Sequence, residues 1–135
     1  MSGDAVLIGK AAALERCVAR AREELAASAN FSADLTRQDA AILNVERACE
    51  TAIDIAFRLA RTKGLGQPTA NRDAFDLLAR AGIIDAALGD KLKRMVGFRN
   101  LATHRYQELN IAVVEAVIRT GLDDLLAFAA IALRT

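Results

Sequence analysis

The sequence predicts an all-α fold, an antiparallel bundle of four long helices and one short helix. Hydrophobic residues fill 53% of the 135 positions, but only 4% are aromatic and there is a single proline. Alanine and leucine favour helices, whereas strands prefer the aromatic residues that are scarce here. Apolar residues also recur every three or four positions, the spacing of one helix face. At this length we expect one domain, residues 1–135.

The two longest apolar stripes predict the first two long helices. The first helix is expected from about Asp4 to about Ala29. The second is expected to begin at a cap formed by Thr36 and Asp39 and to end near Lys63. A polar row on the second helix, formed by Asn44, Arg47, Glu50 and Asp54, either is solvated or lines a groove with the segment 99–106.

Capping residues predict the remaining helices. Asn71 is expected to cap a short helix that runs to about Arg80, Asp85 a fourth helix, and Asn110 the last one. Short connections make neighbouring helices antiparallel. On the fourth helix Arg99 continues the apolar stripe of Leu88, Leu92 and Met95. A guanidinium that faces inward needs an anion or another desolvated partner.

Charge and cysteine content exclude several kinds of function. The formal net charge is +1, so attraction to RNA or any other polyanion must be local. Cys17 and Cys49 match no metal-ligand spacing, and we expect them to be small buried residues with reduced thiols. The apolar residues 5–8 are followed by Lys10, unlike a signal peptide or a membrane span. We therefore expect a soluble cytoplasmic protein with no membrane partner.

The segment Arg99-Asn100-Leu101-Ala102-Thr103-His104-Arg105-Tyr106 holds the only histidine and the only tyrosine. On a continuous helix Asn100 and His104 share a face, so the amide could orient the imidazole. Arg99 and His104 lie about 140° apart around the axis, too far to point at one atom. Either the helix unwinds near residues 102–103 or two copies of the chain assemble the site, and we favour both together.

An arginine, a histidine and an asparagine together suit RNA cleavage. A guanidinium grips a phosphodiester, and an imidazole can remove the proton of a ribose 2′-hydroxyl. The 2′-oxygen would then attack phosphorus and leave a cyclic phosphate. One histidine and scattered carboxylates form no metal-ligand set, so we expect neither a metal nor a cofactor. From residue types alone, a capping role for His104 and a half-buried ring for Tyr106 stay open.

Several segments resemble the HepT-like toxins of the HEPN superfamily. The run Met95–Tyr106, with Arg-x-x-x-x-His-x-Tyr inside it, resembles the signature of that family. Residues 43–56 resemble its second helix, and Phe75–Leu78 with Gly82-Ile83-Ile84 resemble its middle connection. The likeness covers about residues 36–130. It implies one HEPN-like helical domain, a homodimer, and a ribonuclease cleft at the dimer interface.

The resemblance also implies a role for each matching residue. Arg99 would contact the scissile phosphate, His104 would act as general base or acid, and Asn100 would support them. Tyr106 would receive AMP from a cognate MntA-like nucleotidyltransferase antitoxin, and the added charge and bulk would shut off RNA binding. Glu50 would face the site and hold an arginine. Arg105 stands where an acidic residue is more usual in the family, which makes the cleft more basic.

The sequence leaves three possible functions open. The first is a toxin of a type VII-like toxin–antitoxin system, a metal-independent endoribonuclease that AMPylation of Tyr106 inactivates. The second is a non-catalytic subunit that binds substrate for, or docks with, a minimal nucleotidyltransferase. The third is a plain helical scaffold, which leaves the inward Arg99 unexplained.

Overall fold

The computed structural model describes residues 3–135, so the first two residues of the predicted domain lie outside it. Its α-helices are α1 (Ala5–Ala27), α2 (Leu35–Thr62), α3 (Asn71–Arg80), α4 (Ala86–His104), α5 (Ile111–Ala116) and α6 (Leu122–Arg134). Short 3-10 turns span Phe31–Ala33 and Tyr106–Glu108, and a π-helical turn, Val117–Gly121, joins α5 to α6. Within the described residues no helix has the length and hydropathy to cross a membrane.

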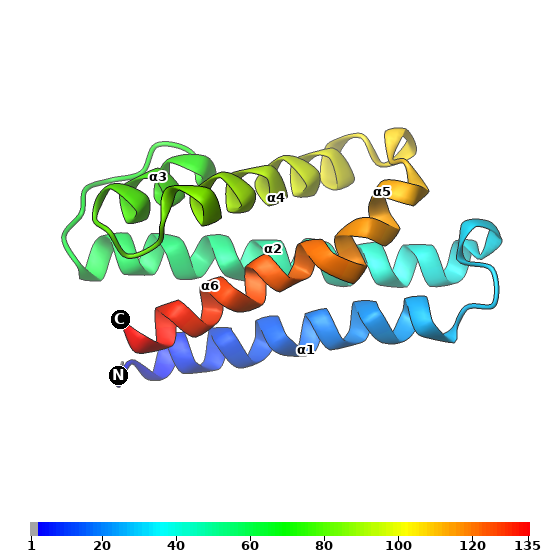
Figure 1. Cartoon of the computed structure of the whole chain (residues 1–135), viewed down its shortest axis with the longest axis horizontal. Helices are drawn as coiled ribbons and strands as arrows, with labels where there is room; N and C mark the ends of the chain where they lie inside the picture. The colour runs from blue at the N-terminus through cyan, green and yellow to red at the C-terminus, as the bar shows by residue number, and fades with distance from the viewer. Residues whose placement is uncertain (1–2) are drawn as a thin grey trace.

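The helices form one bundle around α2. In Figure 1, α1 and α2 lie side by side and antiparallel, and α3 and α4 lie along the other side of α2. The α5–α6 rod crosses obliquely in front of α2, from the end of α4 toward the start of α1, and packs on all three. The predicted all-α bundle is confirmed: α1, α2, α4 and the rod α5–α6 are long, and α3 is short.

The core is apolar and continuous through the bundle. The rings of Phe75 on α3 and Phe128 on α6 meet edge to face, with their centroids 5.4 Å apart. This is a favourable geometry for two aromatic quadrupoles. The largest side chains with almost no exposure are Phe75, Phe128, Leu14, Ile42, Ile55, Leu59, Leu78, Leu92, Ile118, Leu122, Leu125 and Val45.

Two of the predicted caps are confirmed and two are wrong. The side chains of Asp85 and Asn110 accept hydrogen bonds from the first free amides of α4 and α5, as expected. The cap of α2 is Asp34, which accepts from the amide of Arg37, and not the Thr36 pair. This leaves the Asp39 side chain free to bond elsewhere. The cap of α3 is Ala70, whose amide donates to Asp73 at 2.9 Å.

The end of α4 corrects a further expectation. The helix does not unwind near residues 102–103 but continues through His104, and Arg105 is its C-cap. The amide of Arg105 donates to the Leu101 carbonyl at 2.8 Å, and its φ of −140° turns the chain away from the helix axis. Arg99 and His104 therefore sit on different faces of one continuous helix, and Tyr106 belongs to the following turn.

Arg22 of α1 ties the π-helical turn to the bundle. Its Nε donates to the carbonyl of Ile118 at 3.0 Å, and its Nη2 donates to the carbonyl of Arg119 and pairs with Asp123 at 2.7 Å. A π-turn widens the helix and leaves carbonyls in poorer register with their usual donors. A charged donor from the neighbouring helix supports them here.

Candidate functional site at the end of α4

Arg99 points from α4 toward α2 and is anchored there. Its Nη2 forms an ion pair with Glu50, and its Nη1 donates to the side-chain oxygen of Asn100 at 2.9 Å. The side chain is 20% exposed, and its Nε is buried with no hydrogen-bond partner among residues 3–135. The guanidinium is thus held in one orientation while one of its donors stays unsatisfied.

Acidic side chains of α2 face this end of α4. Glu46 lies one turn before Glu50, and the Thr103 hydroxyl is its hydrogen-bond partner. Burial is the main cause that raises the pKa of Glu46; the charge of Arg99 opposes it, and the charge of Glu50 adds to it. Of the polar row predicted on this helix, Glu50 reaches the segment 99–106, whereas Asn44 donates to the carbonyl of Ala40.

His104 faces a different hollow. As the last residue of α4 it is exposed, and with Gly97, Asn100, Leu101 and Arg105 it lines an open groove of about 350 Å³. Asn100 links the groove to Arg99: the residue lines the groove, and its side-chain oxygen accepts a hydrogen bond from the Arg99 guanidinium. That oxygen is directed to the guanidinium and not to the imidazole, contrary to the expected amide–imidazole pairing.

Tyr106 is bonded to α2. Its hydroxyl donates to the carboxylate of Asp39, and the residue is 42% exposed. Burial is the largest cause that raises the pKa of Tyr106 to about 12; the bond to Asp39 and the charges of Asp39 and Glu46 add to it. A phenol beside two carboxylates keeps its proton at neutral pH.

Arg105 is exposed at the edge of the groove. Its Nε lies 3.7 Å from the Glu108 carboxylate, a loose surface pair of the kind that contributes little. Arg105 therefore adds a positive charge beside His104 and Asn100.

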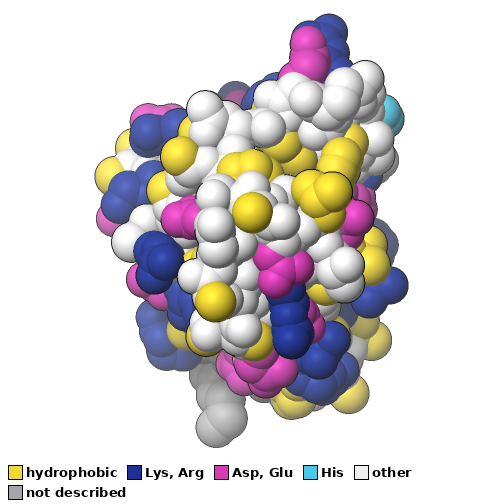
Figure 2. Space-filling model, turned by 90° about the vertical axis from the view of Figure 1, so that its right-hand side faces the viewer, with side chains coloured by type: hydrophobic (Ala, Val, Ile, Leu, Met, Phe, Trp, Pro, Cys, Tyr) yellow, Lys and Arg dark blue, Asp and Glu magenta, His cyan; other side chains and the backbone are white. Residues whose placement is uncertain are grey.

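The structure divides the predicted site residues into two groups. Arg99 and Tyr106 bond to carboxylates of α2, whereas His104 and Arg105 line the groove with Asn100. One chain therefore does not bring the guanidinium and the imidazole onto one side. Figure 2 shows the adjoining end of the molecule, where apolar side chains lie among acidic and basic ones.

The contacts of Asp39 and Glu46 with this site were not predicted, although the sequence holds a signal for them. Asp39, Leu43, Glu46 and Glu50 follow one another at intervals of four, three and four residues, the spacing of a single helix face. This α2 face receives the end of α4. Leu43 on it is 45% exposed.

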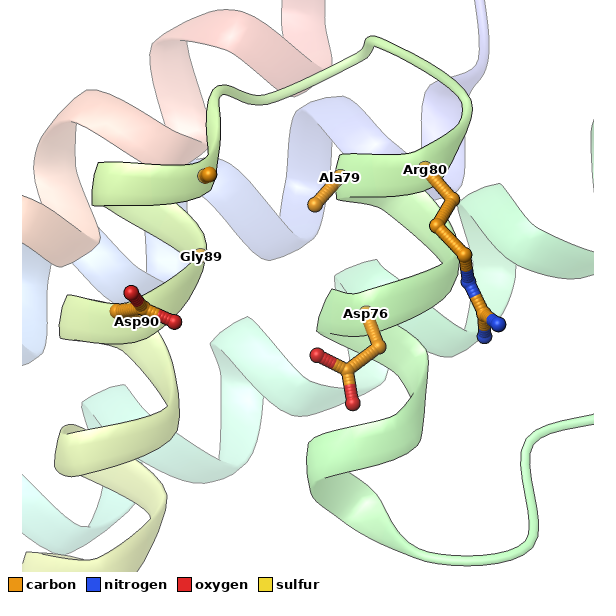
Figure 3. Close-up of a pocket in the computed structure, with 6 residues that line it drawn as sticks. Asp76, Ala79, Arg80, Gly89 and Asp90 are labelled. Carbon is orange, nitrogen blue, oxygen red and sulfur yellow. The ribbon is translucent and has the colours of Figure 1, made fainter.

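A second hollow, of about 300 Å³, lies between α3 and α4 (Figure 3). Asp76 and Asp90 line it, and Lys93 pairs with both, at 2.9 and 3.6 Å.

Among residues 3–135 no three His, Cys, Asp or Glu side chains are placed to hold a metal ion. Cys49 is buried, which raises the pKa of its thiol to about 12, and Cys17 is only partly buried.

Titration of the single tyrosine tests the contact between Tyr106 and Asp39. Because the chain has one tyrosine and no tryptophan, ultraviolet absorbance of tyrosinate reports Tyr106 alone. We expect a midpoint near pH 12 in the folded protein, against the usual value of 10.0. Asp39→Asn should lower it toward 10.0 but not reach it, since burial is the larger cause.

The raised pKa of Tyr106 also determines how the free energy of unfolding changes with pH. The Tyr106 pKa is raised in the folded state, so its contribution is complete below pH 10.0 and is lost as pH rises toward 12. Circular dichroism at each pH checks whether the fold persists, and protein in guanidinium chloride gives the unshifted reference. A folded-state midpoint equal to that reference would contradict the contact.

Comparison with known proteins identifies the family to which the chain belongs. The family model described as ribonuclease HepT-like matches residues 13–131. The mRNA nuclease HepT of Shewanella oneidensis is 44% identical over 119 residues, which cover 88% of this chain and 90% of that protein.

Solved structures agree with this assignment. The tri-AMPylated HEPN toxin of Shewanella oneidensis, in complex with MNT antitoxin, is similar with a TM-score of 0.90 and 41% identity, covering 95% of this chain and 96% of that one. A toxin–antitoxin structure with AMP-PNP gives a TM-score of 0.91 at 40% identity, covering 96% and 98%. Since the family model spans most of the sequence and the folds coincide, this chain belongs to the HepT-like ribonuclease family of the HEPN superfamily.

Proposed function

We propose that this chain is the toxin of a type VII-like toxin–antitoxin system and that its homodimer is a metal-independent endoribonuclease. The similar proteins support the general activity, since one is named an mRNA nuclease and another is a HEPN toxin in complex with MNT antitoxin. The observation that carries the finer proposal is the placement of Arg99 and His104 on different faces of α4.

A second copy supplies what one chain lacks. Arg99 is fixed toward α2 by Glu50, and the groove at His104 is open to solvent. A two-fold axis beside the end of α4 would bring Arg99 of one protomer and His104 of the other to one cleft. The exposed Leu43 on the α2 face supports a contact there, because a large apolar side chain gains from being covered.

The chemistry follows from these two groups. Arg99 binds the nonbridging oxygens of the scissile phosphate and neutralises the charge that grows on them. His104 takes the proton of the 2′-hydroxyl, and the 2′-oxygen attacks phosphorus. The bond from phosphorus to the 5′-oxygen breaks, and that oxygen takes a proton from the imidazolium. The products are a 2′,3′-cyclic phosphate and a 5′-hydroxyl end.

Subunit complementation tests the shared cleft. Arg99→Ala and His104→Ala proteins should each lose RNA cleavage while remaining folded. When the two are unfolded together and refolded as a mixture, half of the dimers are mixed, and each mixed dimer regains one intact cleft. We expect about a quarter of the wild-type rate.

Either of two results would contradict this arrangement. A mixture that stays inactive would place both residues in one chain's own site, and cleavage by His104→Ala alone would remove the imidazole from the reaction. A wild-type dimer that binds the nucleotidyltransferase yet never cleaves RNA would support the docking function in its place.

Tyr106 is the proposed AMP acceptor. Its oxygen attacks the α-phosphorus of a nucleoside triphosphate held by the nucleotidyltransferase, pyrophosphate leaves, and the hydroxyl proton is released. The modified oxygen has no proton to donate, so the bond to Asp39 is lost. The new phosphodiester is repelled by Asp39 and Glu46 and attracted by Arg105 at the groove edge. An anion there competes with the RNA phosphate.

Intact-mass measurement after co-expression with the nucleotidyltransferase tests the acceptor. Wild-type chain should gain whole AMP increments and lose RNA cleavage. Tyr106→Phe should gain none and should stay active, because the ring is kept and only the nucleophile is removed. AMP found on Tyr106→Phe would assign the modification to another residue.

A further inference from the structure

Arg72 of α3 reaches across to α4 beside the groove that holds His104. Its Nε donates to the carbonyl of Lys93 at 3.3 Å. Its Nη2 lies 2.8 Å from the point that a Cβ on Gly97 would occupy. The missing side chain at Gly97 therefore gives the guanidinium room to rest against the helix.

Gly97 connects this guanidinium to the candidate site. It lines the same groove as Asn100 and His104. Gly97 and His104 are seven residues apart on α4, which is about 10 Å along a helix axis. The Arg72 guanidinium therefore lies near one end of the groove. The His104 imidazole and Arg105 lie at the other end.

The charge of Arg72 is available to a ligand. Within residues 3–135 no carboxylate lies within ion-pair distance of Arg72, and the residue is exposed. Lys93, by contrast, is neutralised by Asp76 and Asp90. An exposed arginine held by a backbone carbonyl is partly ordered before any anion arrives, which lowers the entropic cost of binding.

We propose that Arg72, seated over Gly97, binds a backbone phosphate of the RNA strand next to the one that is cleaved. The inference rests on the proposed ribonuclease function and adds a binding position to it. A guanidinium suits a phosphate because its planar donors match two phosphate oxygens. Arg72 binds substrate in this scheme and touches no reacting atom.

Salt-dependent RNA binding tests the proposal. The probe is a short single-stranded RNA with methylated 2′-oxygens, which cannot be cleaved, and the protein is the chain of residues 1–135 made without any nucleotidyltransferase. Fluorescence anisotropy is measured over a range of salt concentrations. Arg72→Gln should weaken binding about threefold to tenfold and reduce the slope of log K against log salt by about 0.7, the value for one lost contact on a single strand.

Matched variants make the result specific. Arg80→Gln removes the same charge from the same helix, beside the hollow drawn in Figure 3, and should leave both affinity and slope unchanged. Arg72→Lys should keep the slope because it keeps the charge. Gly97→Ala should weaken binding by displacing the guanidinium, and adding it to Arg72→Gln should cause no further loss.

The outcomes separate this inference from the proposed function. If Arg72→Gln has the wild-type slope and affinity, the phosphate position is overturned even when His104→Ala abolishes cleavage. If His104→Ala still cleaves RNA, the catalytic scheme fails while the salt slopes continue to decide the role of Arg72. Equal losses in Arg72→Gln and Arg80→Gln would also overturn the position, because they would show an unspecific effect of charge.

Discussion

The ion pair between Arg99 and Glu50 holds the guanidinium against α2 and so restricts how the proposed site can be assembled. A guanidinium that is four-fifths covered cannot be left without an anion, and α2 supplies one. Once Arg99 is bound to α2, helix geometry sends His104 to another face of α4. The division between guanidinium and imidazole is thus a consequence of packing within the bundle, and it is the basis of the proposal that two copies form the site.

A single face of α2 binds both Arg99 and Tyr106. Glu50 holds Arg99, Glu46 is bonded to Thr103, and Asp39 accepts from Tyr106. These contacts cover the last two turns of α4 and the turn that follows it. Modification of Tyr106 would remove the outermost contact of the set and place an anion near the others. Catalysis and its regulation would then act through neighbouring positions on one helix face.

The sequence predicted the bundle because its apolar stripes have the period of a helix and its caps have simple chemistry. Asp85 and Asn110 cap their helices as expected, since their side chains meet the first free amides directly. Thr36 failed as a cap because Asp34, two residues earlier, takes that position. The inward Arg99 was predicted from spacing alone, and Glu50 was named with it through the family resemblance.

Other parts of the site depend on contacts between distant segments. The bond of Tyr106 to Asp39 joins residues 67 positions apart, and the seat of Arg72 on Gly97 depends on how α3 packs on α4. Periodicity places such residues on a face but does not say which face meets which. The end of α4 was also misjudged, because the amide of Arg105 completes the last turn and keeps residues 102–103 helical.

A crystal structure of the dimer with an uncleavable RNA tests the central claim most directly. The scissile phosphate should lie within hydrogen-bond distance of the Arg99 guanidinium of one protomer and the His104 imidazole of the other, with Glu50 still beside Arg99. A phosphate bound by both residues of the same protomer, or a dimer whose α4 ends face apart, would contradict it.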